Sequence, residues 1–153
     1  MPRNGPAIPR YRATEAPAVF QQGFRPFFLG AGLWAVVAMV LWLAELHGRA
    51  VLPAGLPAAA WHAHALLFGY LPAALAGFLL TAVPNWTGRM PLQGAPLAAL
   101  AALWLAGRLA VLLLGGAALP AAAAIDVAFP LVLTAVIGRE IVAGRNWRNL
   151  PVL

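Results

Sequence analysis

The chain has 153 residues, of which 63% are hydrophobic and only 9% are charged, whereas a soluble domain typically carries about a quarter charged residues. The composition excludes an ordinary soluble domain and predicts an all-α, polytopic bundle of transmembrane helices. The formal net charge of +6 comes from arginines that are scattered singly between apolar segments, which argues against a nucleic-acid partner because such proteins gather their basic residues on one face. Cysteine is absent, so disulfides, thiolate metal sites and cysteine nucleophiles are excluded.

Residues 1–23 contain several prolines and arginines without sustained periodicity, and they predict an extended cytoplasmic N-terminal arm. The run from about 27 to 46 has one ionisable residue, Glu45, and is long enough for a helix to cross about 30 Å of hydrocarbon. This first span is too long for the apolar region of a signal peptide, so we expect a retained anchor.

Three further apolar runs predict spans over about 64–83, 97–114 and 119–137. Pro72 and Pro130 fall inside two of these spans, where each proline removes a backbone hydrogen bond and is expected to kink its helix. The pair Gly115-Gly116 predicts a tight turn between the last two spans. The predicted organisation is a four-helix transmembrane domain over 24–138, followed by a cytoplasmic tail over 139–153 that leads to the start of a further span.

Arginines outside the spans predict the orientation of the chain in the membrane. Only Arg49 lies on the side of the connection between the first two spans, whereas the opposite side holds Arg3, Arg10, Arg12, Arg25, Arg89, Arg139, Arg145 and Arg148. Because positive residues accumulate in cytoplasmic segments, both termini are predicted to be cytoplasmic.

His62 and His64 stand two positions apart where the second span begins. Trp61 favours a membrane interface at this point, so both histidines are predicted in the first turn of the helix. Residues two apart on a helix point about 200° away from each other, so one metal cannot take both, and His64, the deeper one, is the candidate that enters the bundle. Two interpretations stay open: interfacial histidines in contact with water and headgroups, or ligands of haem or copper, which both accept neutral imidazole. His47 lies at a similar depth across the outer connection and is a third candidate ligand.

Two charged residues, Arg108 and Asp126, lie well inside the third and fourth spans. An antiparallel hairpin turned between the two spans would bring them to the same depth. Charges inside a membrane are costly unless they are paired or face a cavity. An intramembrane ion pair that sets the helix register is the favoured interpretation, and a proton or substrate path is the alternative.

Several stretches together resemble, in the same order, the amino-terminal part of the NnrS family: "GFRPFF", "WHAHALLFGY", "AGFLLTAVPNWTGR", "LWLAGRLA", "IDVAF" and "GRNWRNLPVL". The resemblance covers residues 23–153. It implies a multi-pass protein of the bacterial inner (plasma) membrane that binds haem, copper or both and is associated with nitric-oxide stress or denitrification. It assigns no catalysed reaction, so whether the chain is an enzyme is left open.

Two departures from the family pattern affect what the resemblance implies. The family continues the histidine pair with glutamate, "HAHE", whereas this chain has Ala65, so a carboxylate that would orient an imidazole is missing. Family members also have more spanning helices, so a fragment, a truncated reading frame or a short paralogue is expected. If the cofactor needs the later helices, this chain binds none. The expected partners are the lipid bilayer and further transmembrane helices or a second copy of the chain. The competing functions are a small transport or channel module that uses Arg108 and Asp126, and a non-functional structural fragment.

Overall fold

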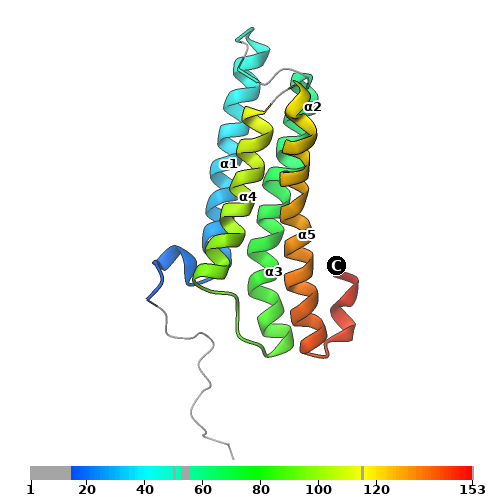
Figure 1. Cartoon of the computed structure of the whole chain (residues 1–153). Coiled ribbons are helices and arrows are strands. Elements are labelled where there is room, and N and C mark those ends of the chain that lie inside the picture. Colours follow the sequence, from blue (N-terminus) through cyan, green and yellow to red (C-terminus); the bar gives the residue numbers. More distant parts are fainter. Residues whose placement is uncertain (1–14, 50, 53–55, 115, 153) are drawn as a thin grey trace, which may run out of the picture.

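The computed structural model describes residues 15–49, 51–52, 56–114 and 116–152, and in this part of the chain all regular structure is helical. Four helical segments are long and apolar enough to cross a membrane, over residues 24–46, 58–87, 95–113 and 116–143 (Figure 1). About 20 helical residues are needed to cross the hydrocarbon layer. The prediction of an all-α fold with four spanning helices is therefore confirmed.

The first span is the single helix α1 (Phe24–Leu46). Gly23 precedes it and lies against the second span, where a Cβ would lie 2.5 Å from the Cβ of Leu80. Pro26 lies in the first turn, where its missing N–H requires no partner within the helix. The backbone at the start of α1 therefore lies in close contact with a neighbouring helix.

The second span is continuous but consists of three segments: α2 (Ala58–His64), the π-helical η2 (Ala65–Tyr70) and α3 (Leu71–Thr87). It begins earlier than the predicted start at residue 64 because the alanines after Pro57 are strong helix formers that continue the helix outward. This corrects the placement of His62 and His64, which lie beyond the first turn.

Pro72 is the second residue of α3, two residues after the end of η2. A proline has no N–H to donate to the carbonyl four residues earlier, and the π-helical turn before it replaces the regular α-helical ladder. A kink was predicted at Pro72, and the irregularity that the structure shows next to it is this π-helical turn. The span ends at Gly88, whose φ of 68° is left-handed, a conformation that glycine adopts without steric cost.

The last two spans are α4 (Ala95–Leu113) and α5 (Leu119–Ala143), joined through the short 3₁₀ helix η3 (Gly116–Ala118). Gly115, half of the predicted turn, lies outside the described residues. Helix α5 continues past the predicted end at Ile137, so the first residues of the predicted tail are helical.

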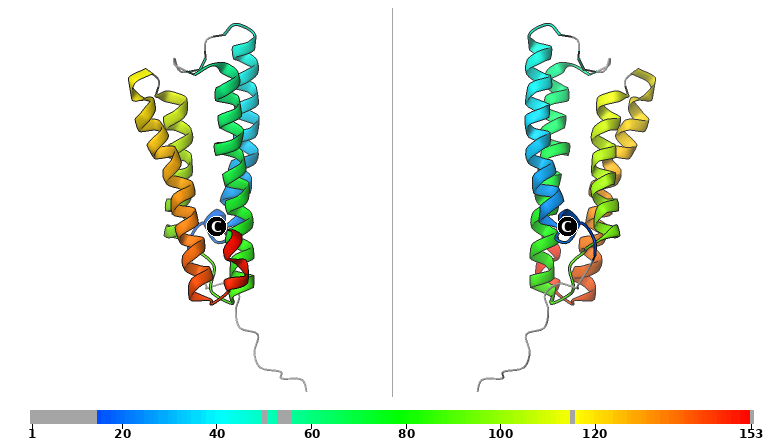
Figure 2. Two further views of the ribbon diagram at one scale, coloured as in Figure 1. Left: turned by 90° about the vertical axis from the view of Figure 1, so that its right-hand side faces the viewer. Right: turned by 90° about the vertical axis from the view of Figure 1, so that its left-hand side faces the viewer.

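The helices pack mainly as two pairs, α1 with α3 and α4 with α5, and α3 also contacts α5. Figure 2 shows the pairs close together at the end where α5 finishes and farther apart at the opposite end. The largest fully buried side chains form one core and come from all four spans: Phe27, Trp61, Val83, Leu97, Phe129, Ile137 and Ile141.

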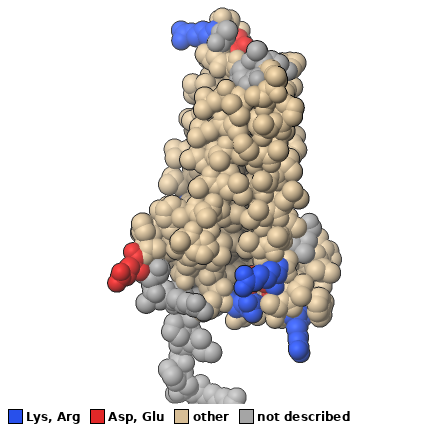
Figure 3. Space-filling view, viewed as in Figure 1, with Lys and Arg blue, Asp and Glu red and all other residues tan. Residues whose placement is uncertain are grey.

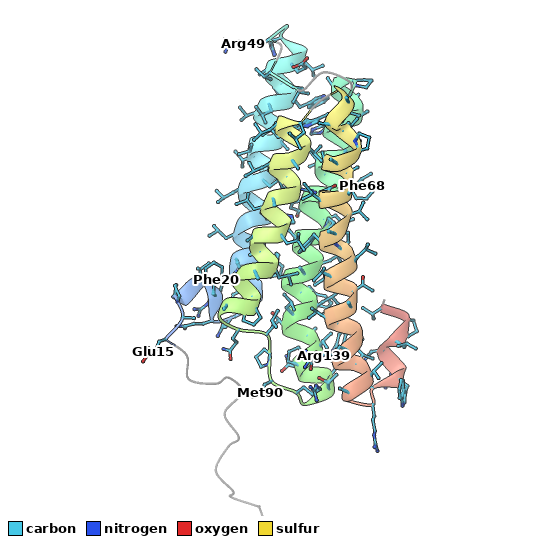
Figure 4. All side chains as sticks on the ribbon, viewed as in Figure 1. Glu15, Phe20, Arg49, Phe68, Met90 and Arg139 are labelled. Atoms are coloured by element: carbon cyan, nitrogen blue, oxygen red, sulfur yellow. The ribbon has the colours of Figure 1, made fainter. Side chains whose placement is uncertain are left out.

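The ends of the bundle differ from its middle in charge. Figure 3 shows acidic and basic side chains on this face only near the two ends, with an uncharged surface between them. Arg49 lies at one end and Arg139 at the other (Figure 4). The described part of the N-terminal arm is not simply extended: it forms the 3₁₀ helix η1 (Ala18–Phe20), and the Phe20 carbonyl accepts a 2.8 Å hydrogen bond from the N–H of Gly94.

Candidate functional site

The buried polar groups of the bundle gather around η2. The indole N–H of Trp34, from α1, donates to the Ala65 carbonyl at 2.8 Å, and that of Trp104, from α4, donates to the Gly69 carbonyl at 2.9 Å. Both acceptors belong to the π-helical turn, and such turns interrupt the regular i to i+4 ladder, often at functional sites. The two indoles therefore fasten α1 and α4 to the second span at this level.

Arg108 and Asp126 form an ion pair beside this turn. One terminal nitrogen of the Arg108 guanidinium contacts Asp126 Oδ1, and both residues are only 2% exposed. The guanidinium carbon lies 5.9 Å from the ring centre of Trp34, a separation at which the π face of an indole attracts a cation. Arg108 Nε and Nη1 are buried without a hydrogen-bond partner among the residues that the structure describes. The pair joins α4 to α5 and neutralises two charges inside the bundle.

His64 is the third member of this group. Its Nε2 lies 3.0 Å from Asp126 Oδ2, so the carboxylate has a guanidinium at one oxygen and an imidazole at the other. The His64 side chain is 30% exposed, whereas that of Asp126 is 1% exposed. The imidazole also stacks on Phe68, with ring centres 4.9 Å apart. His64 thus reaches from the buried pair to the surface of the bundle.

Two glycines make room for this polar group. A Cβ at Gly69 would collide with the indole nitrogen of Trp34 and lie 2.7 Å from Arg108 Nη1. A Cβ at Gly107 would lie 2.7 Å from Asp126 Oδ1 and 3.0 Å from Asp126 Cα. These distances are too short for real Cβ contacts, so the ion pair and the indole occupy space that any other residue would fill.

His62 lies elsewhere. Its ring stacks on Trp42 of α1, with ring centres 4.2 Å apart and an angle of 13° between the planes. Its Nδ1 is buried without a hydrogen-bond partner in the described part of the chain. The two histidines are on one helix but contact different neighbours, α1 in one case and α5 in the other.

His47 is exposed at the end of α1, and its Nδ1 lies 2.7 Å from the Leu43 carbonyl. No contact found between described residues joins it to His62 or His64. Within the described ranges, no group of three or more histidine, aspartate or glutamate side chains is arranged to hold a metal ion. The three candidate histidines are therefore placed in three separate surroundings.

A comparison with known proteins shows to which family the chain belongs. A family model described as NnrS protein matches residues 18–153, a range that contains His64, Arg108 and Asp126. The chain belongs to the NnrS family. No curated protein and no solved structure matches it.

In this NnrS-family chain, the carboxylate beside the His64 imidazole comes from another helix. Position 65 carries alanine, which is buried and whose carbonyl accepts the Trp34 hydrogen bond. The carboxylate comes instead from Asp126 of α5. Sequence reasoning treated Asp126 only as a partner of Arg108, because no local spacing relates it to His64.

Four residues around the ion pair were not predicted from the sequence as part of a site: Trp34, Trp104, Gly69 and Gly107. The two tryptophans carry a usable signal, since both fall well inside apolar runs rather than at the interface where tryptophan is common. A buried indole N–H needs an acceptor, and within a helix bundle an irregular turn readily supplies one. The glycines carry no comparable signal, because glycine occurs in every span.

Proposed function

We propose that this chain is a multi-pass protein of the bacterial inner membrane that binds haem through His64 and acts in nitric-oxide stress or denitrification. Membership of the NnrS family supports the general assignment. The observation that carries the residue assignment is the 3.0 Å contact between His64 Nε2 and Asp126 Oδ2.

The surroundings of His64 would suit a histidine that holds haem iron. An imidazole that ligates a metal usually donates a hydrogen bond from its other ring N–H to a carboxylate or carbonyl. This hydrogen bond fixes the orientation of the ring and raises the basicity of the ligating nitrogen. Asp126 meets this requirement at Nε2, which would leave the other ring nitrogen to hold the iron. Haem iron can be held by a single histidine, so one partly exposed imidazole with a buried carboxylate behind it is sufficient.

The same surroundings fit copper less well. Protein copper sites combine several nitrogen or sulfur donors, and no three histidine, aspartate or glutamate side chains lie together to hold a metal in the described ranges. His62 contacts a different helix from His64. Copper binding would require donors from further transmembrane helices or a second copy of the chain, which are the partners that we propose for the exposed side of the site.

Haem would supply an iron centre able to bind small diatomic ligands, and the protein residues have separate tasks around it. His64 would hold the iron, Asp126 would orient the imidazole, and Arg108 balances the carboxylate's charge. Phe68 lies flat against the imidazole and limits its rotation. The two indole hydrogen bonds keep the backbone of η2, which follows His64 directly, in place.

The test is haem content in variants of the purified protein. Expressed under haem-replete conditions, the wild-type protein should show a Soret band, and His64→Ala should lose it because the imidazole that would hold the iron is gone. His62→Ala and His47→Ala should retain the Soret band. They serve as matched controls because both histidines lie toward the same end of the bundle as His64.

The variant His64→Gly distinguishes loss of the iron ligand from misfolding as the cause of a missing Soret band. Added imidazole should restore its Soret band, because a free imidazole can enter the space left by the side chain, and a misfolded variant would not respond. A wild-type protein without haem would overturn the proposal. Loss of the band in His62→Ala together with its retention in His64→Ala would move the site to His62.

A further inference from the structure

A cavity of about 750 Å³ lies at the opposite end of the bundle from the His64 site. Its walls come from the last turns of α3 and α5, the connection over residues 88–94 and the start of α4. Its volume is within the range of typical ligand pockets, about 300–1,000 Å³. Figure 4 shows Met90 and Arg139, which both line it, at the end of the bundle where α5 finishes.

The rim of this cavity carries an excess of positive charge. Arg89 Nε pairs with Glu140 Oε2, and Arg139 Nε lies 3.8 Å from Glu140 Oε1. Two guanidinium groups thus share one carboxylate, which leaves one positive charge in excess. The Arg139 side chain is 78% exposed, so most of its donors remain available to an anion, and guanidinium groups bind phosphate oxygens especially well because of their planar, forked geometry.

The interior of the cavity is apolar. Leu80, Val83 and Ile137 in its wall are buried, and Val136 is half-buried. A small hydrophilic anion would make no use of these groups. A molecule with a phosphate at one end and a hydrocarbon chain at the other would contact both the rim and the interior.

We propose that this cavity binds an anionic phospholipid, with the headgroup phosphate at Arg89 and Arg139 and the upper part of an acyl chain against the apolar wall. Its walls belong to spanning helices that reach their ends here, which is the level of lipid headgroups. Basic pockets between helix ends are known to bind anionic headgroups. A whole phospholipid is larger than the cavity, so the remainder of its chains would lie along the lipid-facing surface.

The test is native mass spectrometry of the purified full chain in detergent, with equal amounts of palmitoyl-oleoyl phosphatidylglycerol and phosphatidylcholine. The wild-type protein should retain phosphatidylglycerol several-fold better, because the zwitterionic headgroup carries no net negative charge. Arg139→Gln should abolish most of this preference. Arg49→Gln, an exposed arginine at the other end of the bundle, should leave it unchanged.

A second variant tests the apolar part of the cavity without altering its charge. Val136→Phe places a larger side chain in the wall and should reduce retention of phosphatidylglycerol, while size-exclusion chromatography checks that the variant is folded. Equal retention of the two lipids by the wild-type protein would overturn the proposal, as would an unchanged preference in both Arg139→Gln and Val136→Phe. Displacement of phosphatidylglycerol by an equal concentration of inorganic phosphate would assign the site to a free anion and reject the lipid.

Discussion

At the scale of single residues, Asp126 connects the structural and the proposed functional parts of the polar group. Its two oxygens contact Arg108 and His64, which come from different helices. A lone charge at the centre of a bilayer is costly, so each of the two charged residues depends on the other. The imidazole, being more exposed, depends less on the carboxylate for stability than for its orientation.

Removing one partner of the ion pair should destabilise the protein strongly. Asp126→Ala leaves the Arg108 guanidinium buried without a counter-charge, and a loss of about 3–5 kcal/mol in the free energy of unfolding is expected. Reversible unfolding in mixed micelles measures this. Arg108→Met combined with Asp126→Leu should recover most of the loss, because an apolar pair of similar volume removes both desolvation penalties.

The double-mutant cycle over Arg108 and Asp126 isolates the interaction of the two side chains from their other contacts. Arg49→Ala, at an exposed position, is the matched control and should change stability by less than about 0.5 kcal/mol. Additive effects of the two single substitutions would contradict a direct pairing.

At the scale of elements, η2 shows how one irregular turn organises three helices. Pro72, which follows η2, cannot donate a backbone hydrogen bond. Two carbonyls of η2 accept hydrogen bonds from the indole N–H groups of α1 and α4. Gly69 lies within the turn and has no side chain that would push Trp34 and Arg108 away. The turn therefore depends on small size at Gly69 as much as on the hydrogen bonds.

Gly69→Ala should destabilise the protein by about 1–3 kcal/mol, the usual cost of overpacking a core. The added methyl group would collide with the Trp34 indole and the Arg108 guanidinium, which either breaks the hydrogen bond to Ala65 or displaces the ion pair. Thermal unfolding in detergent, followed by tryptophan fluorescence, reports both events.

Gly32→Ala is the control for this substitution. Gly32 lies in α1 and a Cβ there would meet nothing within 4 Å, so alanine should be neutral or stabilise the helix by about 0.5–1 kcal/mol. Equal effects at the two glycines would show that the turn tolerates a side chain.

At the scale of the whole molecule, the four spans make a bundle whose charged side chains lie mostly at its two ends. Of the nine arginines outside the predicted spans, only Arg49 belongs to the connection between the first and second spans. An even number of spans puts both termini on one side of the membrane. The distribution of arginines favours the cytoplasm for that side.

Reporter fusions test this orientation. Alkaline phosphatase, which is active only outside the cytoplasm, should be inactive when fused after Leu153 and active when inserted in the connection over residues 50–58. Green fluorescent protein at the same two positions should give the reverse pattern and serves as the control for expression. Activity of the Leu153 fusion would invert the orientation.

The sequence by itself determined the number of spanning helices and the position of the arginines relative to them, because hydropathy and charge are local properties that accumulate along one segment. It also marked Arg108 and Asp126 as a pair, since their equal distance from one turn is a property of a simple hairpin. Helix ends were less predictable. The alanines before Trp61 favour a helix by their propensity, but hydropathy alone does not show at which of these residues the span begins.

Tertiary structure alone decided which side chains meet across helices that are distant in sequence. The contact of His64 with Asp126 depends on how α2 and α5 are oriented about their own axes. No residue spacing within either segment predicts this orientation. The separation of His62 from His64 follows from helical geometry, but the choice of Trp42 and Asp126 as their partners depends on which helices lie alongside. The π-helical turn likewise depends on two indoles from other spans, since the carbonyls of η2 find these donors only once α1 and α4 have packed against it.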